Sequence, residues 1–191
     1  MLALARTARK VHPTPLEKGK AQMTGHANRG RFFEQYLEHL HARYRVQGCA
    51  RIDFIPTPTR PRNDRGEVTW VPVRKGIVDF VGVLHGGRFV AFDAKSTRNT
   101  RSWRVKVSRR SPSNGTTHQW EYLAEVQALG GLAFYLIYAE RLDRVFVALM
   151  PFPVREAQRF TDMIEVVKDE NGWWDWLSAL EQVGVSKASR R

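Results

Sequence analysis

The pattern of hydrophobic and polar positions divides the chain into a helical segment followed by short strands. Apolar residues recur at helical spacing from Asn28, an acceptable N-cap, to about Arg45, and this spacing predicts a first helix. The following pattern is typical of strands over 51–55, 68–73, 77–84 and 88–95. Proline and glycine between these stretches indicate turns, so we expect an antiparallel meander.

The second half of the chain predicts another long helix and further strands. The expected elements are a helix over 117–129, strands over 132–138 and 145–150, and short helices near 155–160 and 173–180. The stretches 77–84 and 89–94 are apolar on both faces except at Asp79 and Asp93, which is typical of strands covered on both sides. Together these elements predict an α/β fold, in which helices flank a mixed β-sheet with a central antiparallel meander.

Composition adds a strong positive charge to this fold. The 191 residues include 31 Lys and Arg against 19 Asp and Glu, a formal net charge of +12, which predicts a polyanionic partner. A hydrophobic content of 42 % and an aromatic content of 11 % exclude a disordered basic tail protein. We expect a flexible basic arm over 1–29, a single folded domain over 30–191 and a basic loop over 98–114.

Cysteine and histidine restrict the metal sites that this chain can form. The single cysteine, Cys49, excludes an internal disulfide and a multi-cysteine zinc site. The histidines, His41 among them, show no spacing that requires zinc and are expected at the surface or in turns. The longest apolar run, 132–139, is far shorter than the roughly 20 residues of a membrane helix, so no membrane partner is expected.

Asp79 and Asp93 place carboxylates in two otherwise apolar strands. Asp93 and Lys95 project from the same face of a strand, because side chains alternate along it. A three-residue turn at 85–87 would place Asp79 opposite Asp93, whereas a two-residue turn would put them on opposite faces. Paired carboxylates suit Mg²⁺ or Mn²⁺, and a neighbouring lysine completes the groups needed for metal-assisted phosphodiester hydrolysis. The alternative is structural: an ion pair between Asp93 and Lys95, with Asp79 hydrogen-bonded in a turn.

Several motifs in chain order extend this interpretation to a family. Asp79 followed by Asp93-Ala94-Lys95 resembles the PD-(D/E)XK nuclease motif, with Val78 in place of its proline. Further matches are Asn28-Arg29-Gly30 with Glu34, Pro56-Thr57-Pro58, the continuation Ser96-Thr97-Arg98-Asn99, and His118-Gln119-Trp120-Glu121. Together they resemble the RecU family of Holliday junction resolvases over roughly residues 28–150.

The resemblance implies a restriction-endonuclease-like nuclease fold and a homodimer that cuts four-way DNA junctions with Mg²⁺ or Mn²⁺. The implied catalytic residues are Asp79, Asp93, Lys95, Glu34 and Gln119. The implied metal ligands are Asp79, Asp93 and the backbone carbonyl of Ala94. Without the resemblance, Glu34 is better explained as a solvated helix acid. A stalk that enters the junction centre would lie within 58–75, and the enzyme is expected in the cytoplasm, at the nucleoid.

Basic residues are expected to contact DNA phosphates, which positions the nucleic acid largely independently of its sequence. The expected DNA-binding residues are Arg29, Thr57, Arg60, Arg62, Arg98, Arg101, Arg104, Lys106, Arg109 and Arg110. Two other functions are compatible with the sequence. One is a PD-(D/E)XK DNA endonuclease of the restriction or repair type, and the other is a non-catalytic basic module that binds nucleic acid.

Overall fold

The computed structural model describes residues 26–64, 66–73, 76–106 and 117–185. A six-stranded sheet in the order β1-β4-β5-β7-β8-β10 forms its centre. These strands are β1 (Ala50–Phe54), β4 (Phe80–Leu84), β5 (Phe89–Thr97), β7 (Leu132–Ala139), β8 (Arg144–Leu149) and β10 (Ile164–Val166). Neighbouring strands are antiparallel except for β5 and β7, which are parallel. This arrangement confirms the predicted α/β fold with a mixed sheet.

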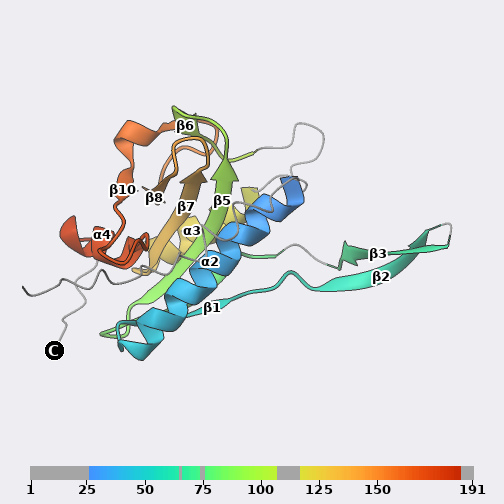
Figure 1. Cartoon of the computed structure of the whole chain (residues 1–191), viewed down its shortest axis with the longest axis horizontal. Helices are drawn as coiled ribbons and strands as arrows, with labels where there is room; N and C mark the ends of the chain where they lie inside the picture. Colours follow the sequence, from blue (N-terminus) through green and yellow to red (C-terminus); the bar gives the residue numbers. More distant parts are fainter. Residues whose placement is uncertain (1–25, 65, 74–75, 107–116, 186–191) are drawn as a thin grey trace, which may run out of the picture.

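Helices cover both faces of the sheet (Figure 1). α2 (His26–Val46) and α4 (Trp176–Gln182) pack on one face, whereas α3 (Thr117–Ala128) connects β5 to β7 and packs on the other. Every residue of β7 is buried, which explains its uninterrupted apolar sequence. No helix in the described ranges is long and apolar enough to cross a membrane.

The apolar stripe expected on the first helix is the face of α2 that packs on the sheet. Its members Phe33, Tyr36, Leu37, Leu40 and Tyr44 are all buried. On the same side, the rings of Phe92 and Phe134 stack with their centroids 4.7 Å apart, and the Trp176 ring packs against both. Helical spacing in α2 and alternation in β5 and β7 therefore build this core as the sequence predicts.

The turn between β4 and β5 fixes the register of the two strands. Leu84 N donates a hydrogen bond to Arg88 O, so three residues form the turn. Gly86 and Gly87 adopt φ values of +88° and +87°, which glycine tolerates because it has no Cβ. Phe80 pairs with Phe92, and the next position along places Asp79 opposite Asp93. The three-residue alternative is therefore the correct one.

The stretch expected at 68–73 does not join the central meander. It forms β3 (Glu67–Pro72), which pairs only with β2 (Thr59–Asp64) in a hairpin that projects from the body of the molecule (Figure 1). Val68 and Trp70 on this hairpin are 63 % and 67 % exposed. The sequence shows the strand propensity of these residues, but it does not show that no other element covers them.

The two-sided cover expected for 77–84 is also wrong in part. β4 begins at Phe80, and Ile77 lies outside the strand with half of its surface exposed. Val83 and Phe89 oppose one another and are 40 % and 42 % exposed. The reason is that α3 packs on β5 and β7 and does not extend over this end of β4.

Four further details of the structure differ from the predictions. The helix expected near 155–160 is wrong: β9 (Gln158–Arg159) pairs with β6 (Ser102–Trp103), and a 3₁₀ helix, η2 (Phe160–Asp162), follows. The edge strand β10 was not predicted, because three residues carry too short a pattern. Two helix starts also differ from the prediction. α2 already includes His26, two residues before the expected cap, and α4 begins only at Trp176, after Asp175 caps it by accepting from Ser178 N.

His41 contradicts the expectation that the histidines lie at the surface or in turns. Its side chain is 3 % exposed and lies edge-on to the rings of Phe80, Phe92 and Trp176. Its Nε2 accepts a hydrogen bond from Trp176 Nε1 at 3.3 Å. Burial lowers the pKa of His41 to about 3. The imidazole is therefore neutral in the folded protein at ordinary pH.

We expect His41 to make the protein sensitive to acid. Because the folded pKa lies below the ordinary value of 6.5, the unfolded state takes up the proton first. The contribution of the neutral His41 imidazole to the free energy of unfolding is complete above pH 6.5. It is lost as the pH falls toward 3, and the total loss is about 5 kcal/mol. Urea unfolding of His41→Phe between pH 6.5 and 4.5 should show a shallower pH dependence than wild type. His85→Phe, in the exposed β4–β5 turn, is the control; parallel curves for wild type and His41→Phe would contradict the prediction.

Candidate active site

Four of the residues expected to be catalytic meet at one place in the sheet. Asp93 and Lys95 lie on β5 and face α3, because alternate residues of a strand share a face. Asp79 immediately precedes β4 and lies opposite Asp93. Gln119 lies in the first turn of α3, which packs over β5. The two strands and the crossover helix thus place four distant residues together.

Direct contacts connect these four side chains. Lys95 Nζ forms an ion pair with Asp93 Oδ2 and lies 3.9 Å from Asp79 Oδ2. Asp79 Oδ2 also accepts a hydrogen bond from the backbone N of Ala94 at 2.9 Å. Gln119 Nε2 donates a hydrogen bond to Asp93 Oδ1 at 2.5 Å. The structure therefore holds both carboxylates in fixed orientations, with one ammonium between them.

Burial dominates the electrostatics of this group. Asp93 is completely buried, and this burial raises its pKa to about 8, with a further contribution from the negative charge of Asp79 and an opposing one from Lys95. Burial lowers the pKa of Lys95, but the carboxylates of Asp93 and Asp79 more than offset that effect and raise it above its ordinary value. Lys95 is therefore a cation, and the raised pKa of Asp93 favours its protonated form when no other positive charge is present.

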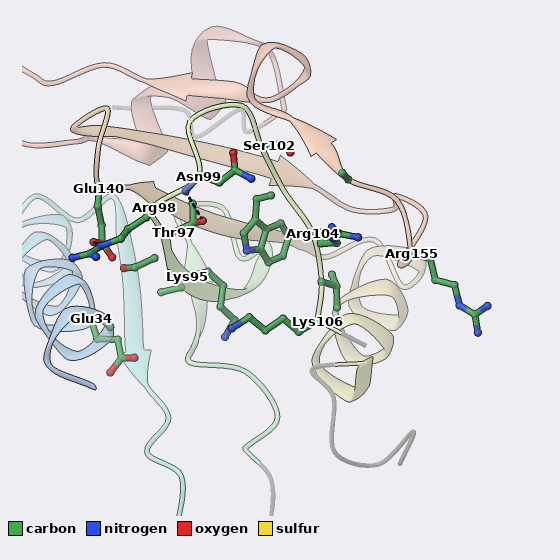
Figure 2. Close-up of a pocket in the computed structure, with 16 residues that line it drawn as sticks. Glu34, Lys95, Thr97, Arg98, Asn99, Ser102, Arg104, Lys106, Glu140 and Arg155 are labelled. Carbon is green, nitrogen blue, oxygen red and sulfur yellow. Dashed lines mark hydrogen bonds and ion pairs between the residues drawn. The ribbon is translucent and has the colours of Figure 1, made fainter. Parts of the chain in front are cut away.

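Glu34 lines the same cavity as Lys95 (Figure 2). This cavity has a volume of about 940 Å³ and lies between the first turns of α2 and the segment that follows β5. Burial, followed by the negative charge of Asp79, raises the pKa of Glu34 above its ordinary value. The structure thus places this helix acid beside the proposed catalytic group, and not on the solvated side of α2.

The carboxylate pair has the chemistry of a divalent cation site. Asp93 is fully buried beside a second acid, and one lysine balances only one of the two charges. Oxygen ligands of this kind suit Mg²⁺ and Mn²⁺, which retain several waters. Ala94, whose carbonyl is the expected third ligand, also lines the cavity. The described residues contain no cluster of three or more His, Cys, Asp or Glu side chains suited to a metal, so backbone and water would supply the remaining ligands.

Basic residues surround the mouth of the cavity. Arg98, Arg104 and Lys106 line it from the expected basic loop, and Arg98 Nε lies 3.5 Å from Glu140 Oε2 (Figure 2). Arg155 also lines it, although no sequence pattern marks this residue as part of the site. The pairing of β6 with β9 brings the segment that contains Arg155 beside the basic loop, and no local signal marks such a contact.

The expected basic loop serves two surfaces. Arg101 lines a second cavity of about 1010 Å³, together with Arg144 and Arg159, while Arg104 lines the first one, beside Lys95. Ser102 lies in the wall that both cavities share. The short strand β6 thus separates positions that the sequence places in a single cationic run.

The remaining residues expected to bind DNA lie elsewhere. Arg60 and Arg62 are exposed on β2 of the projecting hairpin. Thr57 is exposed just before that hairpin, where Gly76 approaches its side chain closely. The side chain of Arg29, together with Arg109 and Arg110, lies outside the described part of the structure. The expected DNA-binding Arg and Lys side chains that the structure describes therefore lie on the hairpin and at two cavities.

Comparison with known proteins places this chain within a family. The model of the family RecU, Recombination protein U, matches residues 28–165. The Holliday junction resolvase RecU of Streptococcus gordonii is 28 % identical over 144 residues, which cover 72 % of this chain and 68 % of the relative.

Other resolvases of the same name match comparable regions. That of Bacillus pumilus is 26 % identical over 166 residues, covering 84 % of this chain and 78 % of the relative. That of Geobacillus kaustophilus is 28 % identical over 128 residues, covering 64 % of this chain and 60 % of the relative. Each relative therefore has a part of its length, up to two fifths, outside the match. The family model and these relatives confirm the resemblance seen in the motifs, and the chain belongs to the RecU family.

Proposed function

We propose that this protein resolves Holliday junctions by hydrolysing phosphodiester bonds in branched DNA, using Mg²⁺ or Mn²⁺ at Asp79 and Asp93. The observation that carries this proposal is the fully buried Asp93, set opposite Asp79 and paired with Lys95 beside a cavity with basic walls. Membership of a family whose named members are Holliday junction resolvases supports the junction as substrate.

Asp79, Asp93 and the Ala94 carbonyl would hold the cation. When bound, it would activate a water and offset negative charge on the phosphate. The protein contributes fixed geometry: Ala94 N donates to Asp79 and Gln119 donates to Asp93, so neither carboxylate has to reorganise. Lys95, which forms an ion pair with Asp93, would orient or deprotonate the attacking water and offset negative charge on the phosphate.

The basic residues of the cavity would position DNA for this chemistry. Arg98, Arg104 and Lys106 lie at the cavity and would contact phosphates, while Glu34 would act on the same space directly or through water. The β2–β3 hairpin would be the stalk: it projects from the body and presents Trp70 to solvent. In this proposal the hairpin reads the branch point, and the cavity holds the strand to be cut.

Symmetric cutting of a four-way junction requires two active sites. A homodimer with a two-fold axis supplies them in opposition, matching the symmetry of the substrate. We therefore propose that the protein acts as a homodimer. Chromosomal recombination intermediates are its substrate, which places it in the cytoplasm at the nucleoid.

Cleavage of three DNA substrates at matched concentration tests the proposal. We expect Mg²⁺-dependent cutting of a four-way junction at least tenfold faster than that of a linear duplex or a flap, with no cutting in EDTA. Equal cutting of all three would identify a restriction or repair type of endonuclease. Junction binding without cleavage under any divalent cation would identify a non-catalytic module, in which Asp79 and Asp93 are structural.

A further inference from the structure

Tyr135 is a completely buried tyrosine next to the catalytic group. It is the pairing partner of Asp93 in the parallel register of β5 and β7, so both side chains leave the sheet on the side covered by α3. Its ring packs against Trp103 and Phe152, with centroid distances of 4.8 and 5.9 Å. Its hydroxyl is buried and has no hydrogen-bond partner within the described ranges. Phenylalanine would pack in the same way without burying a polar atom, so packing does not explain the hydroxyl.

Gln119 has the complementary unpaired atom. Its Nε2 donates to Asp93 Oδ1 at 2.5 Å, whereas its buried Oε1 accepts no hydrogen bond from any described residue. An amide oxygen requires a donor, and a tyrosine hydroxyl supplies one. Burial, together with the negative charges of Asp93 and Asp79, raises the pKa of Tyr135 and keeps its hydroxyl protonated. A donor and an acceptor that have no partner among the described residues thus belong to two neighbours of Asp93, one joined to it by strand pairing and the other by a hydrogen bond.

We propose that Tyr135 is a positioning residue for Asp93. The Tyr135 hydroxyl holds Gln119 Oε1 through one bridging water. A water can accept from the hydroxyl and donate to the amide oxygen, and buried sites with two or more polar partners suit it. Tyr135 does not itself contact substrate. This inference rests on the proposed function, because it gives Asp93 its role as a ligand of the cation.

The reason for such a relay lies in the symmetry of an amide. Rotated by half a turn, the Gln119 side chain would present Oε1 to Asp93 Oδ1, and two acceptor oxygens would face each other. A donor fixed at Oε1 selects the orientation in which Nε2 faces Asp93. Tyr135 therefore holds the carboxylate ready for a cation by way of Gln119.

The test compares Tyr135→Phe with wild type in three measurements. We expect Mn²⁺ affinity, measured by calorimetry on protein without DNA, and the junction cleavage rate to fall about tenfold. Junction affinity and the melting temperature should change little, because the ring is retained. Tyr138→Phe is the matched control, since Tyr138 lies on the opposite face of β7 and donates to Asp143 at 3.0 Å. It should bind Mn²⁺ as wild type does.

A double variant separates action through Gln119 from an independent effect. If the relay exists, Tyr135→Phe combined with Gln119→Met should bind Mn²⁺ no more weakly than Gln119→Met alone. Unchanged Mn²⁺ affinity in Tyr135→Phe, or full additivity of the two changes, overturns the inference. Should wild type bind Mn²⁺ and yet cut no junction, the proposed function fails, while the Mn²⁺ measurements still decide the role of Tyr135.

Discussion

Replacing Asp93 with asparagine is expected to abolish junction cleavage while leaving junction binding intact or slightly tighter. Asp93 is fully buried, accepts a hydrogen bond from Gln119 and forms an ion pair with Lys95. Asparagine has the same shape and can still accept from Gln119, but it lacks the charge that would hold a cation. We expect the cleavage rate to fall at least about a hundredfold, as when a group that stabilises transition-state charge is lost. Binding is retained because the change removes a negative charge near DNA.

Single-turnover cleavage and gel-shift binding in EDTA measure the two effects separately. Asp53→Asn is the matched control: Asp53 is an exposed acid on β1 that pairs with Arg51 at 3.2 Å, on a strand that carries none of the site residues. The Asp53→Asn protein loses the same charge and should cut the junction like wild type. Wild-type cleavage by Asp93→Asn would remove this residue from the site. Loss of binding together with cleavage would instead assign Asp93 a structural role.

Lys95→Met is expected to remove cleavage and also to make stability depend on a divalent cation. Lys95 is the cation that pairs with Asp93 and lies 3.9 Å from Asp79. Methionine keeps much of the length but leaves two neighbouring acids, one of them fully buried, without compensation. Breaking a buried pair in this way costs about 3–5 kcal/mol. Protonation of Asp93 relieves part of this penalty, because its pKa is already raised to about 8.

Urea unfolding with and without Mn²⁺ measures the expected dependence. Lys95→Met should gain more stability from Mn²⁺ than wild type, since the metal replaces a missing positive charge. Lys168→Met is the control, because Lys168 forms an exposed ion pair with Asp143 at 3.2 Å and such pairs are worth about 1 kcal/mol or less. A Lys95→Met protein with wild-type cleavage would show that the lysine takes no part in the reaction.

Short-range patterns determined the parts of the site that lie within one element or across one turn. Helical spacing identified the buried stripe of α2, and strand alternation put Asp93 and Lys95 on one face. The glycines between β4 and β5 allowed a two-residue or a three-residue turn, and Asp79 faces Asp93 only with the three-residue turn. Gln119 and Glu34 came from the family resemblance, because nothing in their own segments distinguishes them from ordinary polar helix residues.

The projecting hairpin and the buried histidine show where local pattern is insufficient. Val68 and Trp70 have the residue types of a covered strand, yet both are largely exposed because no described element packs on β2 and β3. His41 has the residue type of a surface position, yet it lies under the ring of Trp176, 135 positions later. Burial depends on which element arrives from elsewhere in the chain, and hydrophobic spacing within one segment does not contain that information.

The sequence by itself determined the fold class, the family and the acidic pair with its lysine, because each depends on spacing within one segment or on motif order. Only the tertiary structure decided which basic residues share the cavity beside Lys95. The pairing of β6 with β9 places Arg155 at that cavity and Arg101 at the second cavity. The tertiary structure also set Tyr135 beside Asp93, since the β5–β7 register joins residues 42 positions apart. Such neighbours depend on how distant segments pack, which no spacing along the chain specifies.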